Sequence, residues 1–167
     1  MTEPGAARPY MPGYGILPAD QGTGLLPWSW AVKRLTASHD YWVATTDDDG
    51  GPHVMPVWGV WLEDAVWFSS SLRSLRARCI ATRPRVAVTT DNALRPVVIK
   101  GDAVRKSDSD DVARFNDTVN AKYGTDYSVD FYDPAQNGVW RVAPVWAFGL
   151  EEGDFPGSPT RWTFEPR

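Results

Sequence analysis

The chain has 167 residues, 43% of them hydrophobic and 23% charged, a composition that suits one folded domain rather than a disordered chain. Its net charge of −4 argues against a nucleic-acid-binding protein, because such proteins carry an excess of positive charge. The one cysteine, Cys79, cannot form an intrachain disulfide, and no Cys/His cluster offers ligands for a metal. The sequence has no signal-peptide pattern and no apolar run of bilayer length, so we expect a cytoplasmic protein that does not bind a membrane.

Residues 1–24 are rich in proline and glycine, which predicts an extended N-terminal arm rather than a helix or a strand. The arm still carries apolar side chains, among them Tyr10, Tyr14 and Leu17. We therefore expect it to pack either over its own chain or over a partner subunit. Residues 25–167 are predicted to form the single folded domain.

The first element of that domain is a helix predicted over residues 27–39, where Trp28, Ala31 and Leu35 recur at helical spacing. Runs of β-branched and aromatic residues, bounded by turn residues, then predict strands at 41–46, 53–62, 65–70, 85–90, 96–106, 139–150 and 160–164. Two more helices are predicted between these strands, at 74–83 and 109–123. Consecutive strands joined by tight turns favour an antiparallel meander, and hence a mainly β (α+β) fold with a closed or nearly closed barrel.

The first candidate site lies where the strand at 65–70 gives way to the helix at 74–83. Hydroxyl and guanidinium side chains follow one another there: Ser69, Ser70, Ser71, Arg73, Ser74, Arg76 and Arg78. Free backbone N–H groups at a helix start, hydroxyls and guanidinium groups together suit a phosphate. The alternative is a capped helix with solvated arginines. Because no glycine-rich phosphate loop is present, such a site would bind its anion through side chains.

The second candidate is the segment Val54, Met55, Pro56, Val57 and Trp58, in which a proline interrupts an otherwise clear strand. Proline donates no hydrogen bond to a sheet, so the strand is expected to lie at an edge, to be bulged or to be opened at that point. Unpaired backbone groups there could bind the edge of a flat heterocycle such as a flavin. The alternative is a plain edge strand whose proline prevents aggregation.

A third candidate is Trp146, which could stack on a cofactor or on a partner subunit, or could belong to the core. The two histidines, His39 and His53, are not spaced as metal ligands on one element, and we assign them no metal. No side chain stands out as a catalytic acid, base or nucleophile, so the catalytic residues stay unassigned.

Taken in order, these segments resemble the pyridoxamine-5′-phosphate-oxidase-like superfamily. The resemblance lies in the turn and strand Asp48-Asp49-Gly50-Gly51-Pro52-His53-Val54-Met55-Pro56-Val57-Trp58, then Trp67-Phe68-Ser69-Ser70-Ser71, then Ser74-Leu75-Arg76-Ala77-Arg78-Cys79-Ile80. It extends over about residues 41–150. The segments Arg8-Pro9-Tyr10-Met11-Pro12-Gly13-Tyr14-Gly15-Ile16 and Leu26-Pro27-Trp28-Ser29-Trp30 also resemble a branch associated with the deazaflavin coenzyme F420.

The resemblance implies a six-stranded antiparallel split β-barrel that forms a homodimer with the cofactor in a groove between the subunits. It implies that the cofactor phosphate meets the serine loop and the basic helix, and that the ring lies against the strand from Met55 to Trp58. Arg76 stands where relatives often have lysine, and Cys79 where they often have asparagine. The late strand reads Trp146-Ala147-Phe148 and lacks the Arg-x-His pattern of true pyridoxamine-phosphate oxidases, so vitamin B6 oxidation is not expected.

The leading functional hypothesis is therefore an F420-dependent oxidoreductase acting on a small-molecule substrate, with FMN as the alternative cofactor. The cofactor would supply the chemistry, and the protein would position it. A hypothesis from a different class is a carrier that binds a flavin, F420 or haem without turnover. The sequence alone leaves these alternatives open.

Overall fold

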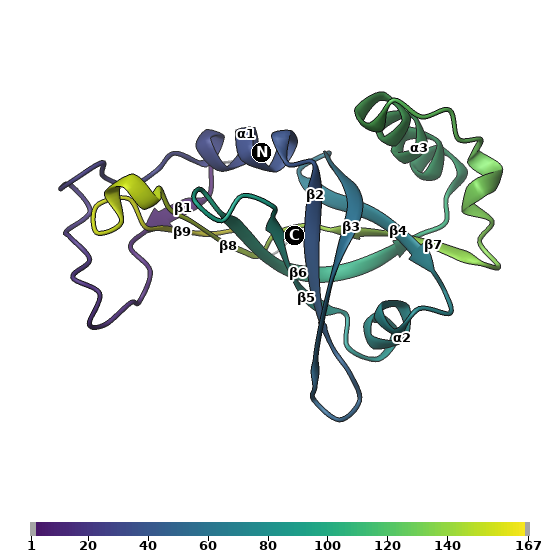
Figure 1. Cartoon of the computed structure of the whole chain (residues 1–167), viewed down its shortest axis with the longest axis horizontal. Coiled ribbons are helices and arrows are strands. Elements are labelled where there is room, and N and C mark those ends of the chain that lie inside the picture. Colours follow the sequence, from purple (N-terminus) through teal and green to yellow (C-terminus); the bar gives the residue numbers. More distant parts are fainter. Residues whose placement is uncertain (1–2, 166–167) are drawn as a thin grey trace.

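A computed structural model describes residues 3–165 of the chain (Figure 1). Within these residues the strands are β1 (Gly5–Ala7), β2 (Asp40–Thr46), β3 (Pro52–Leu62), β4 (Ala65–Ser71), β5 (Arg85–Thr90), β6 (Val97–Lys106), β7 (Asn137–Val142), β8 (Trp146–Gly149) and β9 (Thr160–Thr163). The helices are α1 (Trp28–Ala37), α2 (Leu75–Thr82) and α3 (Ser109–Tyr123), with short 3-10 turns η1 (Val129–Tyr132) and η2 (Glu152–Asp154). None of the helices in this part of the chain is long and apolar enough to cross a bilayer.

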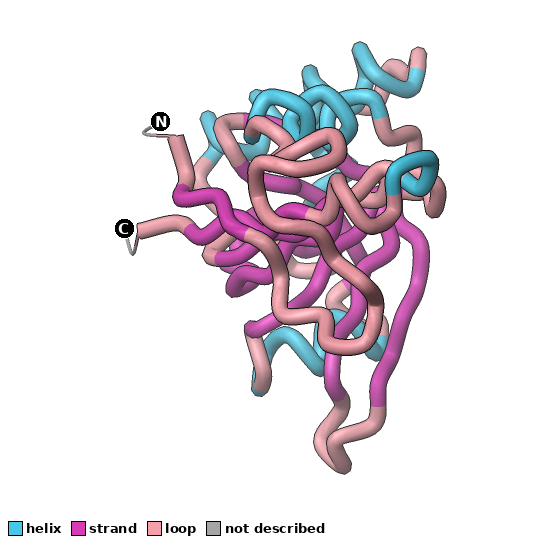
Figure 2. Tube along the Cα trace, turned by 90° about the vertical axis from the view of Figure 1, so that its left-hand side faces the viewer, coloured by secondary structure: helices cyan, strands magenta, loops and turns pink. Residues whose placement is uncertain are grey.

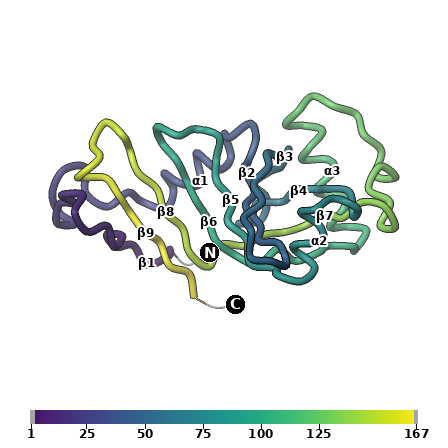
Figure 3. The backbone as a smooth tube through the Cα atoms, turned by 60° about the horizontal axis from the view of Figure 1, so that its bottom comes forward, coloured from purple at the N-terminus to yellow at the C-terminus, as the bar shows by residue number. Residues whose placement is uncertain are grey.

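Six strands form a closed antiparallel barrel. They pair in the order β5-β2-β3-β4-β7, and β6 completes the ring by pairing with both β5 and β7. The remaining strands extend the sheet beyond the barrel in the order β8, β9 and β1, starting from the first half of β6. Figure 3 shows this extension beside the barrel. The predicted six-stranded, mainly β fold with peripheral helices is confirmed.

Strict alternation along the strands defines the inside of the barrel. Along β2, for example, Tyr41 and Val43 are buried, whereas Trp42 between them is exposed. The helix α1 presents Trp28, Ala31 and Leu35 to this interior, and these side chains join the main core cluster. The helix α3 lies outside the barrel against β3 (Figure 1), and packs there through a second, smaller cluster.

The structure corrects the single strand predicted over 139–150. Val142 pairs with Ala103 and Trp146 pairs with Lys100, so three residues, 143–145, lie opposite two, 101–102. This arrangement is a β-bulge, which separates β7 from β8 and bends the strand. Pro144 has no N–H to donate at this point, which explains why the irregularity falls there.

The bulge also explains a glycine on the partner strand. A Cβ atom added to Gly101 would lie 2.1 Å from the carbonyl oxygen of Ala143. Any other residue at position 101 would push the two backbones apart, so glycine is required by the close approach.

The N-terminal arm packs over its own chain. Residues 5–7 of the arm form β1, an element that the sequence analysis did not predict, and this strand pairs with β9. The guanidinium of Arg8 donates hydrogen bonds to the carbonyl oxygens of Pro159 (2.9 Å) and Pro18 (2.9 Å). The backbone N–H of Leu17 donates to the carbonyl oxygen of Pro156 (2.9 Å). The two ends of the described chain therefore lie side by side, as Figure 2 shows.

Candidate functional site

The barrel is split between β3 and β4. The strand β3 pairs with β2 along the range Pro52–Trp58, but with β4 only from Gly59 to Leu62. The strand β4 continues along β7 as far as Ser71. Among the described residues, the facing edges of β3 before Gly59 and of β4 after Phe68 therefore have no strand partner. This opening lies at the base of the long β2–β3 hairpin, which projects beyond the barrel in Figures 1 and 2.

The segment from Val54 to Trp58 lies along this open edge. Pro56 does not interrupt the pairing with β2, where it stands opposite Trp42; the unpaired edge is the one that faces β4. The side chains of Val54, Met55 and Trp58 are about half exposed, at 49%, 49% and 46%, and Pro56 is exposed. Val57 alone points into the barrel core, with 8% exposure. The edge thus combines unpaired backbone with an apolar surface.

The serine loop divides between two sides of β4. The hydroxyl of Ser74 caps α2 by accepting a hydrogen bond from the N–H of Ala77 (3.1 Å). The hydroxyls of Ser70 and Ser74 are 2.9 Å apart, and a guanidinium nitrogen of Arg76 donates to Ser70 (3.3 Å). The structure therefore brings Ser70, Ser74 and Arg76 together. The side chains of Ser69 and Ser71 form no hydrogen bond with these three side chains, because side chains alternate along a strand, but the carbonyl oxygen of Ser71 accepts a hydrogen bond from the N–H of Ser74 (3.0 Å).

Arg76 is the unusual member of the cluster. Its side chain is only 8% exposed, so it is not one of the solvated arginines of the alternative interpretation. Its Nε atom has no hydrogen-bond partner, and no carboxylate of the described residues lies within ion-pair distance. Burial lowers the pKa of the guanidinium below its usual value. A buried cation without an anion is costly, and a phosphate would relieve that cost.

The other predicted residues lie elsewhere. Arg73 is exposed, and its backbone N–H donates to the hydroxyl of Ser71 (3.2 Å) in a local turn. Arg78 is also exposed and shares a hollow with the acidic β2–β3 turn, residues 47–49. Trp146, on β8, is separated from β3 by β6, β5 and β2. It stacks with Phe148, with 6.4 Å between ring centroids.

The sequence analysis missed an aromatic wall beside the opening. A cavity of about 160 Å³ is lined by Trp58 and Ser69 on the barrel side and by α3 and η1 on the other. Its lining residues from α3, η1 and the loop between them are Phe115, Val119, Tyr127, Phe131 and Tyr132. The clustering of aromatic residues in an otherwise polar segment was the available signal. The spacing of these aromatic residues in the sequence did not indicate which strand they would face.

The end of α3 packs this aromatic cluster against β3 at Trp58 and Gly59, where the barrel splits. The rings of Trp58 and Tyr123 stack at 4.2 Å with an interplanar angle of 4°. The Tyr123 hydroxyl accepts a hydrogen bond from the N–H of Gly59 (2.9 Å), and Nζ of Lys122 donates to the Gly59 carbonyl oxygen (2.6 Å). Burial lowers the pKa of Lys122 to about 8. The N–H and the carbonyl oxygen of Gly59, the first residue of β3 beyond the open edge, are therefore both hydrogen-bonded to the end of α3.

The outer face of the sheet forms a second apolar surface. Strand pairing places Pro56, Trp42, Thr89, Val98 and Phe148 in one row across β3, β2, β5, β6 and β8. None of these side chains is fully buried, and Trp42 is 43% exposed. We call this row, with the neighbouring row that contains Val54, Ala44, Ala87, Lys100 and Trp146, the outer sheet face. Most side chains of these two rows are apolar and at least partly exposed, which makes the outer sheet face a candidate interaction surface.

These features define the class of the protein as a split six-stranded β-barrel with an unpaired strand edge, a buried arginine that has no carboxylate partner among the described residues, and an aromatic cavity. A family model described as pyridoxamine 5′-phosphate oxidase matches residues 31–150, most of the chain, and the chain belongs to this family. Its superfamily comprises proteins that bind flavins or F420. The resemblance inferred from the sequence is thus confirmed.

Solved structures share this fold. A conserved hypothetical protein of Mycobacterium tuberculosis is 17% identical, with a TM-score of 0.64 over 83% of this chain and 85% of that one. A protein described as an F420 reductase is 23% identical, with a TM-score of 0.55 over 69% and 93%. A NimC/NimA family protein of Clostridium acetobutylicum is 14% identical, with a TM-score of 0.63 over 81% and 92%. No curated protein matches the sequence.

Proposed function

We propose that the chain is an oxidoreductase that transfers hydride between reduced F420 and a small organic substrate, and that it works as a cytoplasmic homodimer. Membership of a family that includes flavin- and F420-binding proteins supports this assignment. The choice of F420 over FMN is supported by the resemblance of the arm and of Leu26–Trp30 to the F420 branch. A structural neighbour described as an F420 reductase points the same way.

The observation that carries the proposal is the buried guanidinium of Arg76. It has one hydroxyl partner, Ser70, and no carboxylate among the described residues. A phosphate group on the cofactor would supply the missing negative charge. The hydroxyls of Ser70 and Ser74 would add hydrogen bonds. Ser69, Ser71, Arg73 and Arg78 belong to the proposed phosphate site as outer residues, whose effects on affinity should be smaller.

The open edge of β3 suits the ring of such a cofactor. The backbone between Val54 and Trp58 has donors and acceptors that no neighbouring strand of the described chain uses. A bound deazaflavin or flavin would supply the hydride chemistry itself. The protein's own part is to bind and orient: backbone groups would pair with the ring edge, and Met55 and Trp58 would shield it from water.

The aromatic cavity beside Trp58 suits the substrate. Its lining contains no charged side chain and only one aliphatic hydroxyl, that of Ser69. Burying a charge there would be costly, so the substrate is an uncharged, largely apolar molecule. No side chain of the lining is placed as an acid or base, so we assign no catalytic residue.

The outer sheet face supports the homodimer. Its apolar rows would be covered by the same face of a second copy, because a two-fold axis makes a patch contact itself. Trp146 would then contribute to the interface.

Titration of the purified protein with F420, FMN and haem tests the proposal. F420 should bind, and the protein loaded with reduced F420 should reduce uncharged unsaturated substrates while the coenzyme is oxidised. Binding of FMN with no binding of F420 would replace the cofactor assignment. Binding without turnover on any substrate would favour the carrier alternative. If none of the three binds, the cofactor site is refuted.

A further inference from the structure

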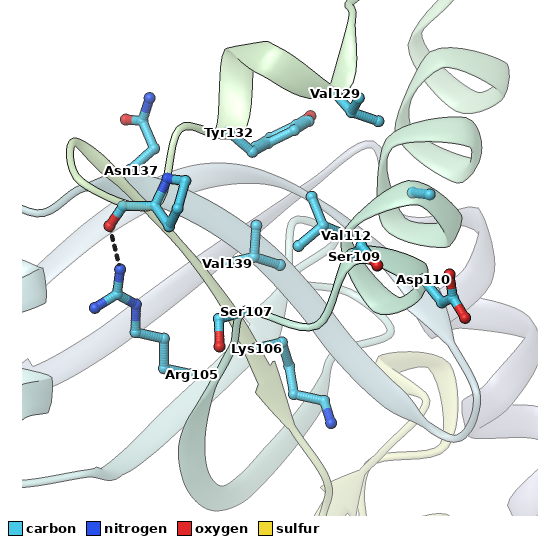
Figure 4. Close-up of a pocket in the computed structure, with 12 residues that line it drawn as sticks. Arg105, Lys106, Ser107, Ser109, Asp110, Val112, Val129, Tyr132, Asn137 and Val139 are labelled. Carbon is cyan, nitrogen blue, oxygen red and sulfur yellow. Dashed lines mark hydrogen bonds between the residues drawn. The ribbon is translucent and has the colours of Figure 1, made fainter.

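A larger hollow lies between α3, η1 and the adjoining parts of β6 and β7 (Figure 4). Its volume is about 460 Å³, within the range of ~300–1,000 Å³ that is common for small-molecule pockets. Apolar side chains from three different elements line it, including Val112 on α3, Val129 on η1 and Val139 on β7. None of the residues that we assign to the cofactor lines this hollow.

Tyr132 contributes a hydroxyl group to the lining. Its side chain is 5% exposed, and edge contacts with Phe115 (5.3 Å between centroids) and Phe131 (5.2 Å) hold the ring in place. Burial raises the pKa of its hydroxyl to about 12, so the hydroxyl keeps its proton at neutral pH. Yet this hydroxyl makes no hydrogen bond to any residue of the described chain. The hydroxyl is not among the fully buried side-chain atoms that lack a partner, so it stays accessible, and an acceptor on a ligand in the hollow can bind it without displacing a protein partner.

Arg105 supplies a positive charge to the lining, on the other side of the hollow from Tyr132 in Figure 4. One of its guanidinium nitrogens donates to the carbonyl oxygen of Pro134 (2.5 Å), which fixes the position of the side chain. No carboxylate in residues 3–165 forms an ion pair with it, whereas the neighbouring Lys106 is paired with Asp111 at 2.8 Å. Asp110 also lines the hollow, but Figure 4 shows its carboxylate directed away from Tyr132 and Arg105.

We propose that this hollow is a second small-molecule site, which binds an amphipathic carboxylate carrying a carbonyl or ether oxygen on its apolar body. The guanidinium of Arg105 binds the carboxylate. The valine side chains contact the apolar body, and the Tyr132 hydroxyl donates to the oxygen on that body. This inference does not depend on the proposed cofactor, because none of these residues is assigned to the cofactor; Tyr132 alone also lines the aromatic cavity beside Trp58.

Three probes of similar size separate these contributions: 4-phenylbutyrate, 4-oxo-4-phenylbutyrate and 4-phenylbutan-1-ol. Each is titrated into the full-length protein without cofactor, and the valine methyl groups are followed by NMR. Binding in the hollow should shift the methyl signals of Val112, Val129 and Val139 in a saturable way. The methyl signals of Val119, which lines the aromatic cavity beside Trp58, should move little.

Two variants then test the polar contacts. Arg105→Gln should weaken the binding of both carboxylate probes by about three- to tenfold and leave the affinity for the alcohol probe unchanged. The expected loss is modest because the guanidinium is solvated. Arg141→Gln is the matched control, since Arg141 also donates to a backbone carbonyl, that of Glu63, and does not line the hollow. Tyr132→Phe should abolish the preference for the oxo probe over 4-phenylbutyrate without lowering the melting temperature.

Saturable shifts confined to the three valines, with both variants behaving as described, would support the site. The proposal is overturned if no probe shifts these methyl signals at millimolar concentration, or if Val119 responds instead. Equal weakening of the alcohol and the carboxylates by Arg105→Gln would also overturn it, as would a preference for the oxo probe that survives Tyr132→Phe. None of these outcomes bears on F420 binding.

Discussion

Replacing Arg76 by methionine should separate stability from cofactor affinity. Methionine keeps most of the side-chain volume but removes a guanidinium that is 8% exposed and has an unpartnered Nε. An unsatisfied buried polar group costs about 1–3 kcal/mol. We therefore expect the free energy of unfolding without cofactor to rise by about 1 kcal/mol, or roughly 2–4 °C in melting temperature.

Cofactor affinity should change in the opposite direction. A charge-assisted hydrogen bond is worth about 1.5–3 kcal/mol, so the Kd for F420 should increase roughly ten- to a hundredfold. Arg76→Lys should lose less, because it keeps the charge but not the planar fork. Lys33→Met, on the exposed side of α1, is a control for the change in net charge.

Calorimetric titration with F420, together with thermal melts of the protein without cofactor, measures both quantities. The reasoning is refuted if Arg76→Met melts several degrees lower and binds F420 as the wild type does. That pair of results would mean that the arginine belongs to the fold.

Three other perturbations follow from the geometry. Burial lowers the pKa of Lys122 to about 8 in the folded protein, against an ordinary value of 10.5, so the unfolded chain binds this proton more tightly. The free energy of unfolding should therefore rise by about 1 kcal/mol between about pH 8 and 9.5. Urea unfolding should show this increase with pH in the wild type and not in Lys122→Met. Gly101→Ala should lower the stability by about 3 kcal/mol or more in thermal melts, because its Cβ would meet the Ala143 carbonyl at 2.1 Å, whereas Gly153→Ala, with open space around it, should have little effect. Trp42→Arg should convert a dimer to a monomer in light scattering by placing a charge on the outer sheet face, while Leu94→Arg in the β5–β6 turn should leave the dimer intact; a wild-type monomer at micromolar concentration would contradict the interface.

The barrel could be predicted because its strands alternate so regularly. In β2 and β5 every second residue is buried, and the turns between strands carry glycine or acidic residues that end a strand plainly. The bulge at 143–145 was not predictable in the same way. Its register depends on the close approach of Ala143 to Gly101, two positions that are distant in the chain and that no local pattern connects.

The candidate site was predictable in part. The resemblance to the family directed attention to Ser70, Ser74 and Arg76, which the structure brings together. The burial of Arg76 could not be foreseen, because it depends on how α2 packs against β2 and β4. The aromatic wall was missed for a related reason. Its residues lie on α3 and η1, and only the tertiary contact of Tyr123 with Trp58 and Gly59 shows which strand they face.

The pairing of β1 with β9 bears on the order in which the molecule can fold. Gly5 and Thr163 are joined by a hydrogen bond although they are 158 residues apart in the chain. Every strand of the barrel lies between them in the sequence, so during synthesis the barrel strands are complete while β1 still lacks its partner. Contacts of such long sequence separation carry a large loop-closure cost unless the intervening chain is already ordered. The strand β1, which leaves the ribosome before the barrel strands, therefore pairs only after all of them have been made.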